Sequence, residues 1–532
     1  MRPHRRVISL GPNLRSFVVF CCLAIALPTT VRAAGLVQLR FPASVCADSV
    51  GGGGFGFCTP DQTYDDYYQF YDNFDTRSDA LSETTFIFHP RLGTSSLSGD
   101  IGLALGWFNP SLVPLEGTAT SELAWLPADD SSFLRLRWRP HGWRTGEGIS
   151  LALYPYSSDR LRLGYRWGVS WGGSAIFLHA TNPDLADFAL TSGAVPGARL
   201  ALRKGRVQAF VGAKATSLLD VVDNKTHYVG AVLGGAGVDL PASLRLEANG
   251  GWFDRGVNPK EGVLGQPVRS YGASVQLSYA HGAGVPREID YSLATRDPTS
   301  PDHAFRKRTD RAGLSYVVSG EATWVATTLQ DPDHPTKSTA QNAWASDLEL
   351  RMQDGAWRFE ATAMMRSLAF ILLNVPGFDP FQAISPADDT TPETFFTVRS
   401  DFHLPRLRLT PGIAAGLEAP STFTGSFPKA LAGNIPQEAL PQAPTVVIDN
   451  PGEYEILPPC ATGPCTAAPL LGAKAFVRVD IVGGHLAGYV EVHFQRDANI
   501  TALERRSPQD PYVRVLADAN EWGGRATLVG RY

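Results

Sequence analysis

The chain has 532 residues, of which 19% are charged, and its formal net charge is −5 at pH 7. Its 52 glycines and 39 prolines, with a charged fraction below the roughly 25% of soluble domains, disfavour long surface helices and favour many strands joined by turns. The acidic balance and the lack of a recognition module give nucleic-acid binding no support.

Residues 1–33 are predicted to be a secretory signal peptide. Four arginines precede the apolar run 17–27, which ends in the small-residue stretch "VRAAG". The run is shorter than the about 20 apolar residues that a membrane-spanning helix needs. We therefore expect cleavage after Ala33 and export of the remaining chain.

Residues 34–80 are predicted to form an N-terminal segment stapled by a disulfide. Four cysteines lie beyond the signal, and an exported protein reaches an oxidising compartment where such an even set forms disulfides. The local pairs Cys46–Cys58 and Cys460–Cys465 are the simplest of three connectivities. A zinc site at Cys460 and Cys465 has no nearby His or Cys to complete it, so we expect no metal and no other cofactor.

The stretch "CTPDQTYDDYYQFYDNFD", residues 58–75, has the spacing of a short helix. Thr59 and Gln62 form a capping box, and four tyrosines follow at helical intervals. One interpretation is a helix that packs its tyrosines against the mouth of a barrel. The other is a small plug, or a platform for sugar or calcium, although the aspartates do not match an EF-hand loop.

From residue 81 to 532 the chain alternates between apolar and polar residues. In "FLRLRWRPHGWRT", residues 133–145, three apolar side chains alternate with three arginines. Successive side chains of a strand point to opposite faces, so this stretch has one apolar and one charged surface. The same pattern predicts a strand over 160–171 with Leu161, Leu163 and Trp167 on its apolar face, and it recurs at 199–215, 347–366 and 473–495.

The connections between these strands differ in length. Tight turns are expected near 93–96, 128–131, 157–159, 204–205, 240–241, 354–355, 404–405 and 483–484. Longer irregular stretches are expected at 172–193, 217–225, 254–267, 330–340, 371–391, 419–469 and 498–520. Short turns at one end and long loops at the other are typical of a transmembrane up-and-down antiparallel β-barrel, here all-β with about 16–22 strands.

The two-faced strands need two environments. An Arg or Lys facing lipid at the bilayer midplane costs about 2–4 kcal/mol, so the arginines should face a watery lumen and the apolar faces lipid. A soluble secreted β-sandwich would alternate in the same way. The barrel is favoured because seven tryptophans lie in or at the ends of strand-like runs, as aromatic girdles require, and because the chain ends in the strand-like "GGRATLVGRY".

These features together resemble the Gram-negative outer-membrane β-barrel class, porins in particular. The resemblance implies a bacterial outer-membrane location, contact with outer-membrane lipid, and insertion by the barrel-assembly machinery, which reads a terminal aromatic strand such as the one ending at Tyr532. It covers roughly residues 82–532 and includes no family-specific motif, so no functional residue follows from it.

Eight arginines are the candidate selectivity residues of the lumen: Arg135, Arg137, Arg139, Arg160, Arg162, Arg166, Arg199 and Arg203. Clustered cations in a narrow passage raise the local concentration of anions. The alternative is that they pair with lumen carboxylates such as Glu122, Glu247 or Asp347 and hold the wall together.

The predicted function is passive diffusion of small hydrophilic solutes, with anions preferred. One alternative is a non-conducting barrel that serves as a structural or export component of a surface assembly. Another is an outer-membrane lipid hydrolase, because "GVSWG" matches a nucleophile elbow at Ser170. Its residues continue a strand pattern, so we expect no enzyme. The Pro-rich stretch 419–469 is interpreted as an inward-folded constriction or a mobile outer loop.

Overall fold

The computed structural model describes residues 38–48, 55–57, 85–88, 91–94, 96–108, 126–129, 132–156, 158, 161–164, 195–220, 225–282, 313–374, 381–425, 445–450, 453–458, 466–482, 486–504, 513–516 and 519–531. The predicted signal peptide, the predicted helix over 58–75 and three of the four cysteines of the predicted disulfides (Cys58, Cys460 and Cys465) lie outside these ranges. Arg160, Arg166 and Ser170 also lie outside them.

The described chain is dominated by one 21-stranded antiparallel sheet. Its strands, in chain order, are β1 (Gln38–Asp48), β2 (Phe55–Phe57), β3 (Thr85–Phe88), β4 (Arg91–Gly93), β5 (Leu97–Phe108), β6 (Leu126–Asp129), β7 (Phe133–Trp138), β8 (Gly148–Tyr154), β9 (Gly197–Lys204), β10 (Val207–Asp220), β11 (Lys225–Leu240), β12 (Leu244–Val257), β13 (Pro267–His281), β14 (Leu314–Gln330), β15 (Ser338–Asp354), β16 (Trp357–Arg366), β18 (Glu393–Phe402), β19 (Leu409–Ala419), β23 (Leu470–Val482), β24 (Leu486–Arg496) and β27 (Asn520–Arg531).

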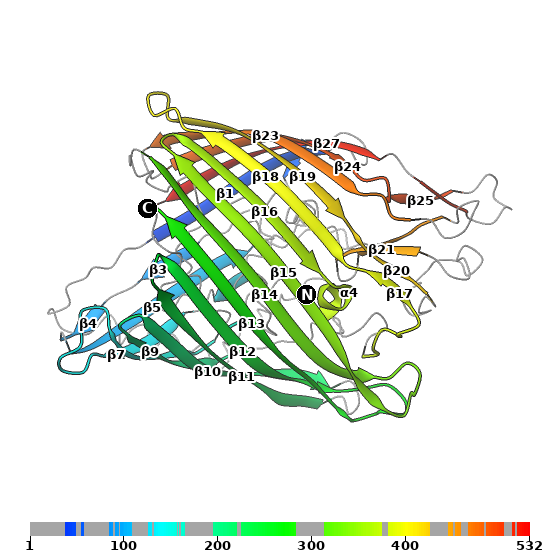
Figure 1. The fold of residues 1–532 in the computed structure, drawn as a ribbon, viewed down its shortest axis with the longest axis horizontal. Coiled ribbons are helices and arrows are strands. Elements are labelled where there is room, and N and C mark those ends of the chain that lie inside the picture. The colour runs from blue at the N-terminus through cyan, green and yellow to red at the C-terminus, as the bar shows by residue number, and fades with distance from the viewer. Residues whose placement is uncertain are drawn as a thin grey trace, which may run out of the picture.

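The sheet closes on itself. Each wall strand pairs antiparallel with the next along the chain, and β27 pairs with β1 from Arg531↔Arg40 to Gly523↔Asp48. Among the 21 described strands, β3 and β4 lie end to end along one edge of β5, and β6 and β7 lie end to end along its other edge. Each of these pairs counts as one interrupted wall strand, and we call each wall strand a stave. β2 is a short addition beside β1. The ring therefore has 18 staves, and the predicted up-and-down barrel of about 16–22 strands is confirmed (Figure 1).

The first stave of the ring is β1. It lies beside β27, the last strand, so the two ends of the described chain meet in the wall (Figure 1). The barrel wall therefore begins at Gln38, inside the 34–80 segment for which the sequence predicts a separate stapled unit. Cys46 belongs to this stave, opposite Arg525 of β27 and Gly56 of β2.

Most turns at one end of the barrel are short, as predicted at 204–205 and 354–355, although the longer connection 282–313 between β13 and β14 lies at the same end. Gly205 and Gly355 occupy them with φ of 58° and 54°, the left-handed region that glycine adopts without strain. Larger connections at the other end carry a four-stranded sheet of β17 (Asp389–Thr391), β20 (Ser421–Thr424), β21 (Thr445–Asn450) and β22 (Glu453–Ile456), and the pair β25 (Thr501–Glu504) and β26 (Val513–Leu516).

Two short helical turns follow β16: α4 (Leu368–Ile371) and the 3-10 turn η1 (Leu372–Asn374). Within the described ranges no helix combines the length and the apolar character needed to span a bilayer.

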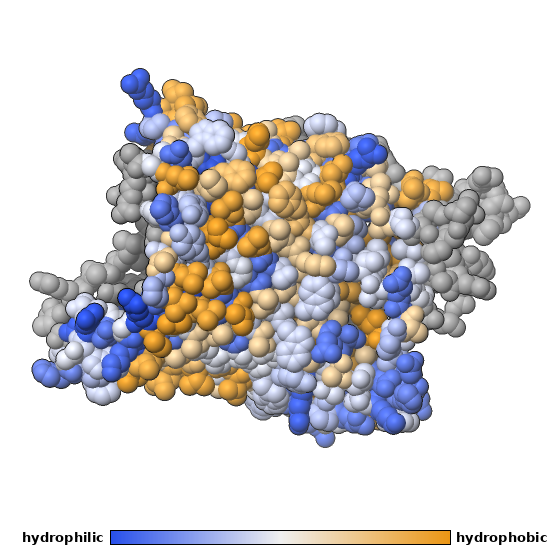
Figure 2. Space-filling view, viewed as in Figure 1, coloured by the Kyte–Doolittle hydropathy of each residue, from blue (hydrophilic) through white to orange (hydrophobic). Residues whose placement is uncertain are grey.

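The barrel buries charged side chains on its inside and exposes apolar side chains on its outside, the reverse of a soluble protein. On β12, Arg245 and Glu247 are 1% exposed, whereas Leu246 between them is 38% exposed. The same alternation places Leu136, Val275 and Leu348 on the outside, and Figure 2 shows apolar residues gathered over the outer surface between polar ends. A soluble sandwich would bury the leucines and expose the charges, so this arrangement excludes the sandwich.

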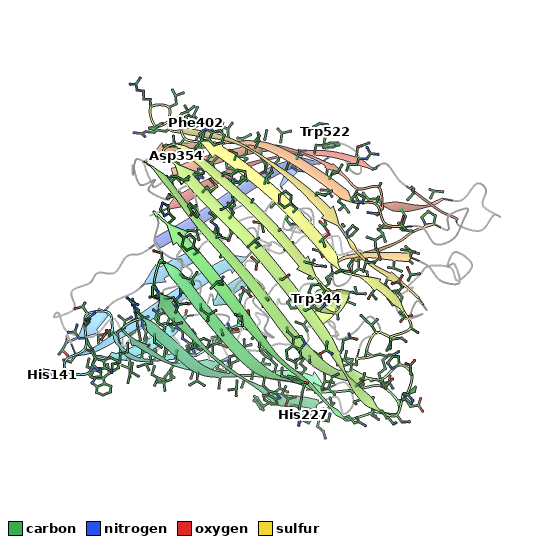
Figure 3. All side chains as sticks on the ribbon, in the orientation of Figure 1. His141, His227, Trp344, Asp354, Phe402 and Trp522 are labelled. Atoms are coloured by element: carbon green, nitrogen blue, oxygen red, sulfur yellow. The ribbon has the colours of Figure 1, made fainter. Side chains whose placement is uncertain are left out.

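Aromatic side chains lie near both ends of the apolar surface. Trp252, Tyr271, Trp324 and Trp344 are exposed on neighbouring strands toward the long-loop end, and Trp357 and Phe402 toward the short-turn end. Figure 3 shows Trp344 far along β15 from Asp354 and the short turns. About 10 strand residues at about 3.4 Å each, tilted by about 45°, span about 25 Å, the height of the apolar band of an outer-membrane barrel.

We expect Leu348→Arg to destabilise the barrel in lipid by about 2–4 kcal/mol, because the new charge would face hydrocarbon near the midplane. The matched control is Ala340→Arg on the same outer face of β15, beyond Trp344, where the cost should be about 0–1 kcal/mol. Urea-induced unfolding in phospholipid vesicles measures both. Equal costs for the two variants would contradict the assigned lipid-facing band.

Candidate functional site: a charged and partly filled lumen

Cationic side chains gather on one sector of the inner wall. Arg135 and Arg137 lie on β7, Arg199 and Arg203 on β9, and Lys214 on β10, at positions that alternate with exposed apolar residues. The backbone register sets Arg135 and Arg199 opposite the same small residue, Ala152 of β8. Four of the eight predicted selectivity residues are thus brought together on β7 and β9, the two strands that flank β8.

Aromatic rings support two of these guanidinium groups. The guanidinium of Arg135 lies 5.4 Å from the ring centroid of Phe133, and that of Arg199 lies 5.6 Å from that of Phe210. A ring face attracts a cation electrostatically and restricts its movement. The arrangement holds both charges close to the wall.

Two further predicted selectivity residues are not part of the barrel wall. Arg139 follows the end of β7 and belongs to the turn before β8, where its Nη1 donates to Thr145 Oγ1 at 3.4 Å. The strand expected to continue through Arg139 stops at Trp138 because Pro140 and Gly142 begin the turn. Arg162 lies on a segment inside the barrel, between Leu161 and Leu163.

Carboxylates occupy a different sector. Glu247, Glu321 and Asp347 fall in one register row across β12 to β15, linked through Gln276 of β13. The hydroxyls of Ser274 and Thr323 donate to Glu321 at 3.0 and 2.9 Å. The sequence analysis missed Glu321, although it alternates with outward-facing residues in "SGEATW".

Other luminal arginines are held in ion pairs along the wall. Arg245 bonds Glu247, Asp239 and Gln208, while Arg358 makes two hydrogen bonds to Asp401 at 3.0 and 2.8 Å. The remaining pairs are Arg351–Glu349 at 2.5 Å, Arg366–Glu393 at 2.6 Å and Lys474–Glu491 at 3.4 Å. These other cations of the described wall therefore show the kind of pairing with lumen carboxylates that the alternative interpretation expects.

The segment 161–164 is the described part of the strand predicted over 160–171, and for these four residues the prediction is wrong. Leu161 and Leu163 do not face lipid but are 1% and 0% exposed inside the barrel, in one cluster with Leu233, Phe253 and Val325. Of the turn predicted at 157–159 the structure describes Ser158, which is buried and whose Oγ donates to the Val195 carbonyl at 2.8 Å. Alternation alone cannot distinguish a wall strand from an extended segment packed inside the wall.

Glycines on the inner wall make room for this segment. A Cβ at Gly212 would lie 2.9 Å from Leu161 Cδ2, and one at Gly272 would lie 2.8 Å from Leu163 Cδ2. Gly164 has φ of 79°, and its N–H donates to Asn249 Oδ1 at 3.0 Å. The segment is therefore fitted to β10, β12 and β13 and narrows the lumen.

The helical turns α4 and η1 fill the lumen from a second direction. Phe370 and Leu373 join the same luminal cluster as Leu161 and Leu163. Leu368, Ile371 and Leu372 instead pack against the small sheet through Phe423, Val446, Ile448 and Ile456. The stretch 419–469, predicted to lack regular structure, thus contributes three strands to the small sheet that packs against α4. Among the described residues, the segments that fold into the lumen are 161–164 and the α4–η1 turns.

The sequence analysis also missed Arg255, which lies near the long-loop end of β12. Arg255 Nε donates to Ser270 Oγ at 2.6 Å, and that hydroxyl lies 2.7 Å from Thr327 Oγ1. In the described part of the chain Arg255 Nη2 is buried without a hydrogen-bond partner. No signal in the sequence separates Arg255 from other strand-end arginines.

We expect Arg366→Met to destabilise the barrel by about 3 kcal/mol, because Glu393 would keep a buried charge without its partner. The double variant Arg366→Met/Glu393→Gln removes both charges and should recover most of the loss. Urea unfolding in vesicles measures both variants. If the double variant were as unstable as the single one, the buried charge would not be the cause.

No protein-family model matches the chain, and no curated protein matches it in sequence. Among solved structures it is similar to the Pseudomonas aeruginosa proteins OccK2 (OpdF), at 8% identity over 95% of this chain and 98% of that one with a TM-score of 0.39, and OccK11 (OpdR), at 10% identity over 93% and 95% with a TM-score of 0.41. It is also similar to OmpT, an outer membrane protein of Vibrio cholerae, at 8% identity over 95% and 100% with a TM-score of 0.32. Likeness at this level says nothing about function, so the function is inferred from the geometry of the barrel itself.

Proposed function

We propose that this chain is a bacterial outer-membrane channel for passive diffusion of small hydrophilic solutes, and that it prefers anions. The observation that carries the proposal is the closed ring with apolar residues outside and charged residues inside. A ring of 18 staves is wide enough to leave an aqueous passage. Its partners in this role are outer-membrane lipid, the permeating solutes and, during insertion, the barrel-assembly machinery.

The anion preference is supported by the cationic sector. Arg135, Arg137, Arg199, Arg203 and Lys214 share neighbouring strands, and the carboxylates of the β12–β15 row lie elsewhere on the wall. In a narrow passage with low-dielectric walls such a sector raises the local concentration of anions. The buried nitrogen of Arg255 adds a further donor on the inner wall.

A non-conducting barrel that serves a surface assembly is the second candidate. The observation in its favour is that Leu161, Leu163, Phe370 and Leu373 occupy part of the lumen. Single-channel recording in planar bilayers separates the two, because a pore produces discrete conductance steps and a filled barrel produces none. Hydrolysis of phospholipid by the purified protein would instead support the enzyme alternative.

We expect Arg135→Gln/Arg199→Gln to lower the anion-to-cation permeability ratio. A water-screened charge about 8 Å from a permeating ion stabilises an anion and destabilises a cation by about 0.5 kcal/mol each, so the loss of two charges should lower the ratio by up to about 30-fold. The reversal potential under a KCl gradient measures the change. Arg406→Gln, in the short turn between β18 and β19, is the control and should leave the ratio unchanged; an equal effect there would contradict a luminal origin of the selectivity.

We expect Gly164→Ala to change the single-channel conductance, because its Cβ would stand 2.6 Å from Glu321 Oε1 and would displace the luminal segment. Gly142→Ala is the matched control: Gly142 has a similar φ of 81°, but nothing lies within 4 Å of the added carbon. Both variants carry the backbone strain, and only the first disturbs the lumen. Unchanged conductance in Gly164→Ala would show that the segment does not border the passage.

A further inference from the structure

Cationic residues gather on the outside of the barrel at the short-turn end. The turn between β7 and β8 contributes Arg139, His141 and Arg144. The end of β9 contributes Lys204, and the turn that follows it contributes Arg206. We call these five residues the basic patch. Figure 3 places His141 at the tip of this corner, and Figure 2 shows the corner as strongly hydrophilic beside an apolar surface.

One carboxylate holds the two turns together. Glu147 Oε2 accepts from the N–H of Arg144 at 2.9 Å, and its Oε1 accepts from the N–H of Gly205 at 3.0 Å. These backbone hydrogen bonds, with the nearby charges of Arg144 and Lys204, lower the pKa of Glu147. Asp239, whose N–H donates to the Arg206 carbonyl, is engaged by Arg245. Glu147 thus sets one negative charge against the four Arg and Lys charges of the basic patch.

The basic patch adjoins the apolar band directly. Lys204 lies two residues, or about 7 Å, beyond the outward-facing Leu202, and its Nζ is 5.1 Å from the ring centroid of Trp143. Trp138, 51% exposed, immediately precedes Arg139. Tryptophan at the edge of hydrocarbon with cations just beyond it matches the order of acyl chain and phosphate in a phospholipid.

We propose that the basic patch binds the phosphate headgroup of an anionic phospholipid, whose acyl chains lie along the outer faces of β7 to β10. This inference rests on the proposed function in one respect, namely that the apolar band lies in a bilayer with the short turns at the periplasmic leaflet. Exposed Leu136, Leu200 and Leu202 form the apolar surface for the chains. The positive charge of the patch opposes the net charge of the chain, −5, so the attraction is local to this corner.

The test is native mass spectrometry of the full barrel after exchange into mixed phosphatidylglycerol and phosphatidylcholine micelles. The wild type should retain phosphatidylglycerol preferentially. Each cation near an anionic surface contributes about 1 kcal/mol, about fivefold, so Arg144→Gln/Lys204→Gln should lower the preference about 25-fold. Arg406→Gln/Arg408→Gln removes equal charge from another short turn and should leave the preference unchanged.

Several outcomes would overturn the proposal. Equal retention of the two lipids by the wild type would show that the patch serves a different partner, such as an acidic periplasmic protein, and equal loss in the control variant would show that attraction is not local. A heat-modifiable gel shift identifies any variant that fails to fold. In addition, 0.5 M NaCl should abolish the preference of the wild type for phosphatidylglycerol, because at about this salt concentration surface charges are screened within a few Å. Failure of the barrel to insert or conduct would count against the proposed function instead, because lipid retention is measured without conductance.

Discussion

The structure depends on one constraint: every backbone N–H and C=O that meets hydrocarbon must be paired within the protein. A sheet satisfies this only when it has no free edge, so the pairing of β1 with β27 is as necessary as any pairing within the sequence-adjacent hairpins. In a closed barrel each strand also contacts lipid on one face and water on the other. The outward positions meet lipid and the inward positions meet water, which explains why Arg245 and Glu247 are hidden while Leu246 is exposed.

Closure at 18 staves leaves an interior that the wall side chains do not fill. The chain fills part of it with its own connections. The segment 161–164 enters from the β8–β9 connection, and α4 enters from the connection after β16. Their meeting in one apolar cluster links the lumen to the small sheet at the long-loop end, since α4 contacts both. Inward glycines such as Gly212 and Gly272 are the counterpart of this packing in the wall.

The charges of the wall serve two roles that differ by location. From β15 to β24, arginines and lysines form ion pairs with carboxylates of the adjacent strand, which link neighbouring parts of the wall. On β7 to β10 the inward cations follow one another across neighbouring strands, with small residues such as Ala152 between them. The first arrangement stabilises the wall, and the second is the basis of the proposed preference for anions.

The period of two in the sequence determined the strands and their apolar and polar faces, because the alternation is a local property of each strand. The tryptophans at the strand ends and the terminal strand favoured a membrane barrel over a soluble sandwich. The alternation also identified Arg135, Arg137, Arg199 and Arg203 as one group. Tertiary structure alone decided the rest: that "LRLG", residues 161–164, lies inside the barrel, that α4 bridges two clusters, and that Arg358 pairs with Asp401. A local pattern states which face of a segment is apolar, but whether that face meets lipid or another part of the same chain depends on contacts between residues far apart in the sequence.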